Sequence, residues 1–188
     1  MKATRALARL AAAAAALSFA LSAHASNHAP IPVEIVEQDG AYTLLRGGEP
    51  YQIRGAGLQF SDIAIFAANG GNSIRTWSTD NAAELLQAAL EHDITVMLCL
   101  GIDRERHGFD YDDEEAVAAQ LEWARGEVLK YKDHPALLGW IIGNEPDLHY
   151  TNPKVFDAIN DISRMIHEVD GRHPTTTALS FSFKPELV

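Results

Sequence analysis

Apolar residues follow two different periods along this chain, and segments of the two kinds alternate. From Tyr51 onward, short apolar runs bounded by Gly, Asn or Asp alternate with longer segments whose apolar residues recur every three or four positions. The runs predict strands and the spaced segments predict amphipathic helices. We expect strands at residues 51–56, 73–77, 94–102, 136–143 and 175–181, and helices beginning near Ser61, Asn81, Asp112 and Asn152. This alternation favours an α/β fold with a parallel sheet and right-handed crossovers.

Helix starts are indicated by capping residues. Asn81 with Glu84, and Asp112 with Glu115, have the spacing of a capping box. Asn152-Pro153 has the order of an N-cap followed by proline at the first helical position.

Residues 26–50 have a different pattern and predict a small antiparallel lead-in. The alternating runs Val33–Val36 and Tyr42–Leu45 flank an Asp39-Gly40 pair. Asp-Gly between two such runs is typical of a β-hairpin. We expect this lead-in to cover the bottom of the sheet that follows.

The first 25 residues are typical of a secretory signal peptide. Lys2, Arg5 and Arg9 precede an Ala- and Leu-rich run over 10–21, and Ala23-His24-Ala25 is a small-x-small cleavage site. A retained membrane anchor is the alternative, but the apolar run is short for a bilayer crossing. We therefore expect an exported protein, periplasmic or extracellular, that begins at Ser26 and has no membrane partner after cleavage.

Charge and cysteine content narrow the range of partners. The chain has 15 Lys and Arg against 26 Asp and Glu. Three of the basic residues lie in the expected signal, which leaves 12 and a formal charge of −14 for the mature chain. An acidic surface repels phosphate backbones, so no nucleic-acid partner is expected, whereas a neutral polysaccharide is unaffected. The single Cys99 lies in an apolar run and is interpreted as a buried thiol rather than a nucleophile.

The strand predicted over 136–143 runs directly into Asn144 and Glu145. Because parallel α/β folds bind ligands at the carboxyl ends of their strands, both side chains are candidate site residues. A Glu beside apolar walls is partly desolvated, which raises its pKa and suits it to proton transfer. The alternative is that the two residues simply open the next loop.

The stretch from Lys130 to Glu145, ending in HPALLGWIIGNE, resembles the fourth strand of the clan A (β/α)8 glycoside hydrolases, and most of all the barrel domain of family 2. The resemblance extends to NSIRTW at 72–77 and RHGF at 106–109, and covers roughly residues 40–180. It implies that Glu145 is the general acid/base and that Asn144 binds the 2-hydroxyl of the sugar. It also implies a carbohydrate substrate with β-linkages.

The same resemblance implies that residues 51–188 form about the first five βα units of a TIM barrel. A complete barrel takes about 250 residues, so we expect a fragment, a truncated product or a short variant; a complete five-stranded open sheet is the alternative. Retaining glycosidases need a second carboxylate as nucleophile, and the resemblance places it beyond the C-terminus. Asp103, Glu105 and Asp147 are possible substitutes, but solvated loop charges or partners of Arg104 and Arg106 are the favoured interpretation.

Four further residues are candidates for substrate binding. Arg75 matches a family arginine that supports the catalytic carboxylates, although a structural ion pair explains it equally well. Trp77 could stack on a sugar ring or pack in the core. His107 and Tyr150 lie in loops where such barrels bind ligand. Of the other tryptophans, Trp140 is expected in the core and Trp123 in helix packing.

No metal or cofactor is expected. The eight His form no Cys/His cluster, and their one His-x-x-x-His pair, His24 and His28, is split by the expected cleavage after Ala25. Gly55-Ala56-Gly57 lacks the later glycine of a dinucleotide site. Three functions remain: a retaining β-glycosidase or transglycosylase, an inactive carbohydrate-binding remnant, and a periplasmic α/β binding protein. We favour the first. The oligomeric state cannot be predicted.

Overall fold

The structure, a computed structural model, describes residues 29–180. The expected signal peptide at 1–25 lies outside the described residues, as does Phe181 at the end of the expected fifth strand.

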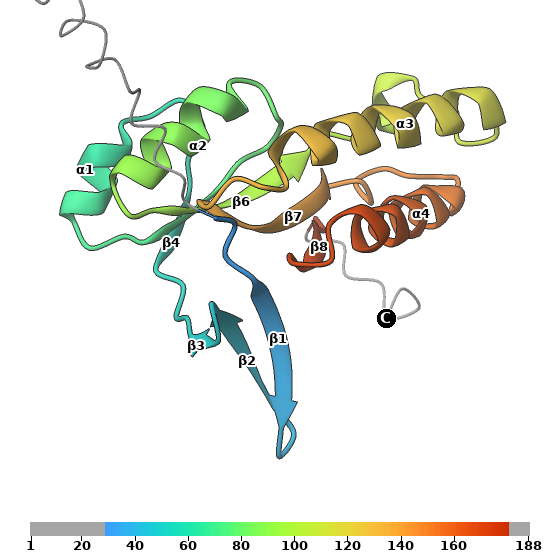
Figure 1. The fold of residues 1–188 in the computed structure, drawn as a ribbon. Coiled ribbons are helices and arrows are strands. Elements are labelled where there is room, and N and C mark those ends of the chain that lie inside the picture. The colour runs from blue at the N-terminus through green and yellow to red at the C-terminus, as the bar shows by residue number, and fades with distance from the viewer. Residues whose placement is uncertain (1–28, 181–188) are drawn as a thin grey trace, which may run out of the picture.

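The fold has a small antiparallel sheet followed by four βα units and a fifth parallel strand (Figure 1). The strands are β1 (Val33–Gln38), β2 (Ala41–Arg46), β3 (Glu49–Pro50), β4 (Gly55–Gly57), β5 (Ser73–Arg75), β6 (Thr95–Leu100), β7 (Leu137–Asn144) and β8 (Thr175–Ala178). The helices are α1 (Ile63–Ala68), α2 (Ala82–Glu91), α3 (Glu114–Tyr131) and α4 (Lys154–Val169), with a 3-10 turn, η1, at Glu105–His107.

The main sheet has five parallel strands in the order β4-β5-β6-β7-β8. Neighbours in sequence are therefore neighbours in space, as in a TIM barrel, and β4 lies at an edge rather than between β5 and β7. This order confirms the predicted α/β fold class, a partial TIM-barrel-type domain preceded by a hairpin. Because all five strands run the same way, their carboxyl ends meet at one edge.

The two faces of the sheet differ in composition. Ile74, Leu98, Leu100 and Ile142 belong to the buried core shared with the helices. Residues between them in the strands, such as Arg75, lie on the opposite face, which is the concave side of a barrel. Trp140 belongs to the core as expected.

Trp123 departs from the prediction. It lies on α3 but is 42% exposed, because Ala124, Val128 and Tyr131 form the buried stripe of that helix and position 123 points away from it. Gln120 is also buried there, which the apolar period did not indicate.

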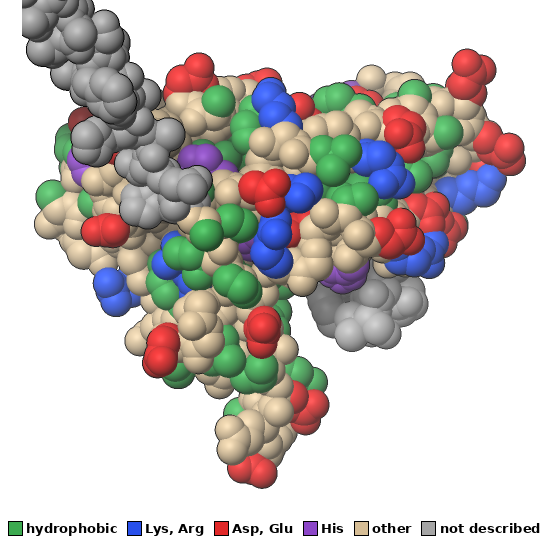
Figure 2. All heavy atoms as spheres, in the orientation of Figure 1, with side chains coloured by type: hydrophobic (Ala, Val, Ile, Leu, Met, Phe, Trp, Pro, Cys, Tyr) green, Lys and Arg blue, Asp and Glu red, His purple; other side chains and the backbone are tan. Residues whose placement is uncertain are grey.

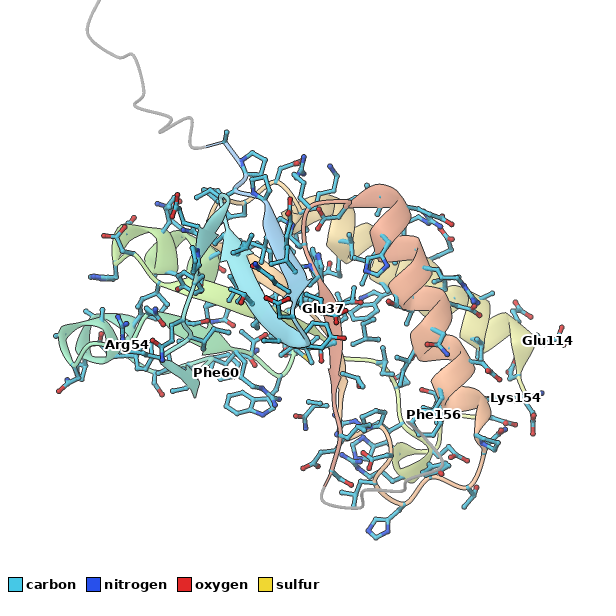
Figure 3. The ribbon with its side chains drawn as sticks, turned by 90° about the horizontal axis from the view of Figure 1, so that it is seen from below. Glu37, Arg54, Phe60, Glu114, Lys154 and Phe156 are labelled. Atoms are coloured by element: carbon cyan, nitrogen blue, oxygen red, sulfur yellow. The ribbon has the colours of Figure 1, made fainter. Side chains whose placement is uncertain are left out.

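The hairpin packs at the amino ends of the parallel strands. This end of the sheet is the bottom that the lead-in was expected to cover. Val33 N donates to Arg172 O before β8, and Arg46 Nη2 donates to Pro135 O before β7. Tyr51 Oη donates to Asn72 O before β5. Viewed from below, β1 and β2 cross in front of the parallel strands (Figure 3). The domain division at residue 50 remains a prediction.

Strand and helix boundaries show three corrections. Residues 51–54 connect the two sheets instead of starting β4, since Tyr51 N donates to Leu44 O of β2. Asn81 is not a side-chain cap: its φ is 54° and its Nδ2 donates to Gln59 O. The cap of α3 is Asp113, not Asp112, which instead pairs with Lys154 Nζ at 2.8 Å.

The start of α4 also differs by one residue. The helix begins at Lys154, so Pro153 precedes it, while Asn152 Oδ1 accepts a hydrogen bond from Lys154 N at 3.1 Å. Lys154 and Glu114 lie close to each other at the ends of α4 and α3 (Figure 3).

A buried polar cluster joins α4, β7 and β8. Asp170 Oδ2 accepts hydrogen bonds from Trp140 Nε1 at 2.7 Å and His173 Nδ1 at 2.8 Å. Burial acts to raise the pKa of Asp170, but the hydrogen bonds from His173 and Trp140 outweigh it and hold that pKa below its usual value. The carboxylate therefore stabilises the folded state above about pH 4, and this contribution is lost as the pH falls through the lowered pKa.

Replacing Asp170 with Ala is expected to lower the free energy of unfolding by about 2–4 kcal/mol at neutral pH, because two buried donors lose their acceptor. Urea denaturation measures this. The control is Asp133→Ala, which removes a 61% exposed partner of Arg172 and should cost under about 1 kcal/mol. Equal losses of unfolding free energy in the two variants would contradict the account. So would a loss for Asp170→Ala that is as large below about pH 4 as at neutral pH.

The face of the molecule shown in Figure 2 has mixed charges. Acidic side chains are scattered over the visible face and are interspersed with Lys and Arg (Figure 2). Among residues 29–180, every helix is too short or too polar to cross a membrane.

Candidate active site

The carboxyl ends of β5, β7 and β8 bring the candidate residues together. Arg75 ends β5, Asn144 ends β7, and Glu145 follows directly. Ala178, at the end of β8, is paired with Asn144 in the sheet and accepts a hydrogen bond from Glu145 N at 2.7 Å. This edge is where a parallel α/β sheet binds its ligand.

The backbone at the end of β7 is in an unusual conformation. Gly143 has φ 76° and Glu145 has φ 52°, on either side of Asn144. A Cβ built on Gly143 would meet Ile102 Cγ1 at 2.8 Å. A left-handed backbone is rare for a residue with a side chain and costs of order 1–3 kcal/mol, so the surrounding contacts must hold Glu145 in place.

Gly143→Ala is expected to lower the free energy of unfolding by about 1–3 kcal/mol, because a methyl group at φ 76° is strained and meets Ile102. The control is Gly126→Ala, in the exposed middle of α3, where nothing lies within 4 Å of the added Cβ. That change should stabilise the protein by up to about 1 kcal/mol. Thermal denaturation compares the two, and a neutral or stabilising Gly143→Ala would contradict the account.

The side chain of Glu145 does not lie among apolar walls as the sequence suggested. It is 41% exposed, and its Oε2 lies 3.6 Å from Arg106 Nη2. The apolar desolvation expected for this carboxyl group is therefore not what the structure shows, since an arginine lies beside it. The reason is that the loop after β6 carries Arg106 across to the end of β7.

Arg75 contacts an amide rather than a carboxylate. Its Nη2 donates a hydrogen bond to Asn144 Oδ1, and its guanidinium lies over the Trp77 ring at 5.3 Å from the centroid. Among residues 29–180 Arg75 forms no ion pair, and its expected support of the catalytic carboxylates stays a prediction. The geometry instead orients the Asn144 amide, with the carbonyl oxygen toward Arg75.

Trp77 lies just after the carboxyl end of β5 and is not part of the core. It is 44% exposed, and its ring packs on Gly57, where an added Cβ would meet Cζ2 at 2.9 Å. An exposed indole at this edge has the surface needed to stack on a sugar ring.

Gln59 is a supporting residue that the sequence did not indicate. It is only 4% exposed although it lies in the loop after β4. Its Oε1 accepts from Trp77 N at 2.9 Å and its Nε2 donates to Ser78 Oγ at 2.7 Å. A single polar residue in a loop has no periodic pattern, so only its burial reveals the role.

His107 and Tyr150 lie in loops on the same side of the sheet as Glu145. His107 is exposed on η1. Tyr150 is half-buried and packs edge-on against Phe156 of α4 with ring centroids 5.2 Å apart. Their expected contact with substrate stays a prediction.

Two of the three acidic residues considered as substitutes for a second catalytic carboxylate, Asp147 and Glu105, have carboxylates held by hydrogen bonds. Asp147 is 3% exposed and accepts hydrogen bonds from Ser180 N at 2.7 Å and Ser180 Oγ at 2.8 Å. Glu105 accepts from Thr151 and Asn152. The sequence favours solvated loop charges or partners of Arg104 and Arg106 for these residues. In the structure Arg106 instead pairs with Glu145.

Cys99 is fully buried on β6, and burial raises the pKa of its thiol to about 11, partly offset by Arg75 and Arg104. A thiol of that pKa is not a nucleophile near neutral pH. Within residues 29–180, no group of three or more His, Cys, Asp and Glu side chains is arranged to hold a metal ion.

Comparison with known proteins identifies relatives of this fold. Residues 52–184 match the family model described as glycosyl hydrolases family 2, TIM barrel domain. Among solved structures, a β-glucuronidase from Ruminococcus gnavus matches with TM-score 0.63 and 18% identity, over 84% of this chain and 29% of that one. A GH2 β-galacturonidase from Eisenbergiella tayi matches with TM-score 0.61 and 20% identity, over 81% of this chain and 28% of that one.

A β-D-glucuronidase from Dictyoglomus thermophilum matches with TM-score 0.58 and 18% identity, over 80% of this chain and 29% of that one. This chain spans less than a third of the length of each of these three structures. At such identities the likeness shows a shared fold.

Proposed function

The chain belongs to glycosyl hydrolase family 2, and we propose that its protein is a retaining glycoside hydrolase or transglycosylase acting on β-linked sugars. Glu145 is the general acid/base in this proposal. The observation that carries it is the Asn144-Glu145 pair at the carboxyl end of β7, with Arg75 on the amide and Arg106 on the carboxylate. Arg75 and Arg106 thus fix the Asn144 amide and the Glu145 carboxylate side by side, which preorganises a polar site.

The proposed reaction has two steps that share Glu145. In the first, protonated Glu145 donates its proton to the glycosidic oxygen as a carboxylate nucleophile attacks the anomeric carbon and the leaving group departs. In the second, ionised Glu145 takes a proton from water, which attacks the anomeric carbon and releases the sugar. Glu105 and Asp147 are not proposed as the nucleophile, since their carboxylates are held by neighbouring residues.

The other site residues act on the sugar. Asn144 binds the 2-hydroxyl. Arg75 orients the Asn144 amide by donating a hydrogen bond to its Oδ1. Trp77 offers an exposed ring for stacking, supported from behind by Gln59. His107 and Tyr150 are proposed to contact the substrate from their loops.

We propose β-linked carbohydrate as the substrate class. The solved relatives are named as β-glucuronidases and β-galacturonidases, so uronides belong among the substrates to test along with neutral β-glycosides. The proposal also includes export from the cytoplasm. N-terminal sequencing of the exported protein should begin at Ser26, and an intact N-terminus at Met1 would contradict export with cleavage.

The test of this function uses the protein in the form its host produces. A panel of 4-nitrophenyl β-glycosides and β-uronides is assayed for release of nitrophenol, and proton NMR follows the anomeric configuration of the first product. Turnover with retained β-configuration supports the proposal. Carbohydrate binding without turnover would indicate an inactive binding remnant instead, and an inverted product would contradict the retaining mechanism.

A further inference from the structure

Arg106 lies on the loop after β6 yet makes its contacts at the end of β7. Its Nη1 donates to Glu145 O at 2.6 Å and to Leu148 O at 3.5 Å. Its Nη2 lies 3.6 Å from Glu145 Oε2. The side chain is 17% exposed, so these interactions are largely shielded from water. One guanidinium therefore holds both the backbone and the carboxylate of the same residue.

The loop that carries Arg106 is itself tied down by the preceding residue. Glu105 Oε2 accepts from Thr151 N at 2.7 Å and from Asn152 N at 3.0 Å, and Glu105 Oε1 accepts from Thr151 Oγ1 at 2.9 Å. Burial acts to raise the pKa of Glu105, but the hydrogen bonds from Asn152 and Thr151 outweigh it and hold the pKa below its usual value. An ionised Glu105 therefore anchors the loop after β6 to the start of α4.

Glu145 needs such support because its backbone is left-handed. Its φ of 52° is unfavourable for a residue with a side chain. Three hydrogen bonds hold the backbone of this residue. Its amide donates to Ala178 O at 2.7 Å, and its carbonyl accepts from Arg106 Nη1 at 2.6 Å and from Leu148 N at 3.2 Å. Without Arg106 the two backbone contacts remain, while the carbonyl loses the shorter of its two hydrogen bonds and the carboxylate loses its ion pair.

We propose that Arg106 is a positioning residue for Glu145 and that Glu105 anchors the loop that carries it. This inference rests on the proposed function, in which Glu145 is the acid/base. Arg106 contacts protein atoms at Glu145 and Leu148, so its removal lowers kcat and leaves KM nearly unchanged. A misplaced catalytic group typically costs about 10- to 100-fold in rate, which is the loss expected for Arg106→Ala.

The experiment is a double-mutant cycle with chemical rescue, using the aryl β-glycoside that the protein hydrolyses fastest. Arg106→Ala should lose about 10- to 100-fold in kcat, and added guanidinium ion should restore part of that loss. Arg106→Lys, which keeps one charged donor, should lose less. In a Glu145→Gln background, Arg106→Ala should cause almost no further loss, because the residue it positions no longer transfers a proton.

The matched control is Arg164→Ala, which removes an exposed arginine that pairs with Asp161 on α4. Its kcat should be unchanged and should not respond to guanidinium. If Arg106→Ala loses the same factor in the wild-type and Glu145→Gln backgrounds, or if guanidinium restores nothing, Arg106 does not act through Glu145. If Glu145→Gln alone keeps full activity, the proposed function fails, whatever Arg106→Ala does.

A measurement without substrate completes the test. A crystal structure of Arg106→Ala should show Glu145 with a changed φ or a rotated carboxylate, whereas Arg164→Ala should leave both in place. Glu105→Gln, which weakens the anchor but keeps Arg106, should shift Glu145 in the same direction by less. An unchanged Glu145 in the Arg106→Ala structure would overturn the proposal even for a protein with no measurable turnover.

Discussion

Replacing Glu145 with Gln is expected to slow the cleavage of natural β-glycosides by about 10²- to 10⁴-fold, the usual contribution of general acid–base catalysis. Gln keeps the shape of the side chain and removes the proton that the leaving oxygen needs. The substitution also removes the ion pair with Arg106 at 3.6 Å, but the carbonyl contact from Arg106 at 2.6 Å remains. The backbone of the site should therefore stay in place.

The size of this loss should depend on the leaving group. Sugars and alcohols leave poorly and need the acid, so their cleavage should lose the full factor. Acidic phenols leave without a proton and should lose much less in the first step. Pre-steady-state release of phenol across a series of aryl β-glycosides measures the dependence. If the rate of cleavage fell by the same factor for every phenol and alcohol leaving group, Glu145 would not be the residue that donates the proton.

Asn144→Ala is expected to lower kcat by about 10²- to 10³-fold, similar to the loss of a single transition-state hydrogen-bond donor in other enzymes. The side chain would no longer reach the 2-hydroxyl, a contact that strengthens as the transition state forms. Arg75 would also lose its acceptor, Asn144 Oδ1. Because the contact involves the sugar and not the leaving group, all leaving groups should be affected alike.

The control for Asn144 is Asn160→Ala, at an exposed position in the middle of α4. It should leave kcat unchanged for every substrate. Substrates with a 2-deoxy sugar give a second check, since Asn144→Ala should cost them little. A full loss with 2-deoxy substrates would contradict a role at the 2-hydroxyl.

The strand order and the location of the site could be predicted because they follow from local patterns. The apolar run at 136–143 is buried on both faces in the structure, as a central parallel strand must be. Once Ser73 to Arg75 and Leu137 to Asn144 are strands of one parallel sheet, their carboxyl ends lie at one edge. The contact of Arg75 with Asn144, 69 residues apart, is a consequence of that arrangement.

What the sequence did not reveal depends on contacts between loops. Arg106 reaches Glu145 from 39 residues away, and Glu105 reaches Asn152 from 47 residues away. Neither pairing leaves a periodic pattern in the sequence. The contact from Arg106 corrects the idea that Glu145 sits among apolar side chains. Asn81 shows the same limit at short range: its spacing from Glu84 fits a cap, but its αL backbone turns its side chain to Gln59.

The most direct test of the central claim, that Glu145 is the acid/base of a retaining glycosidase, is rescue of Glu145→Gln by azide. Azide attacks the glycosyl-enzyme intermediate without a base, so it replaces the second role of Glu145. With an activated aryl β-glycoside, added azide should accelerate turnover of Glu145→Gln and give a β-glycosyl azide, with no effect on Asn144→Ala. Absence of acceleration, or an α-glycosyl azide, would contradict the claim.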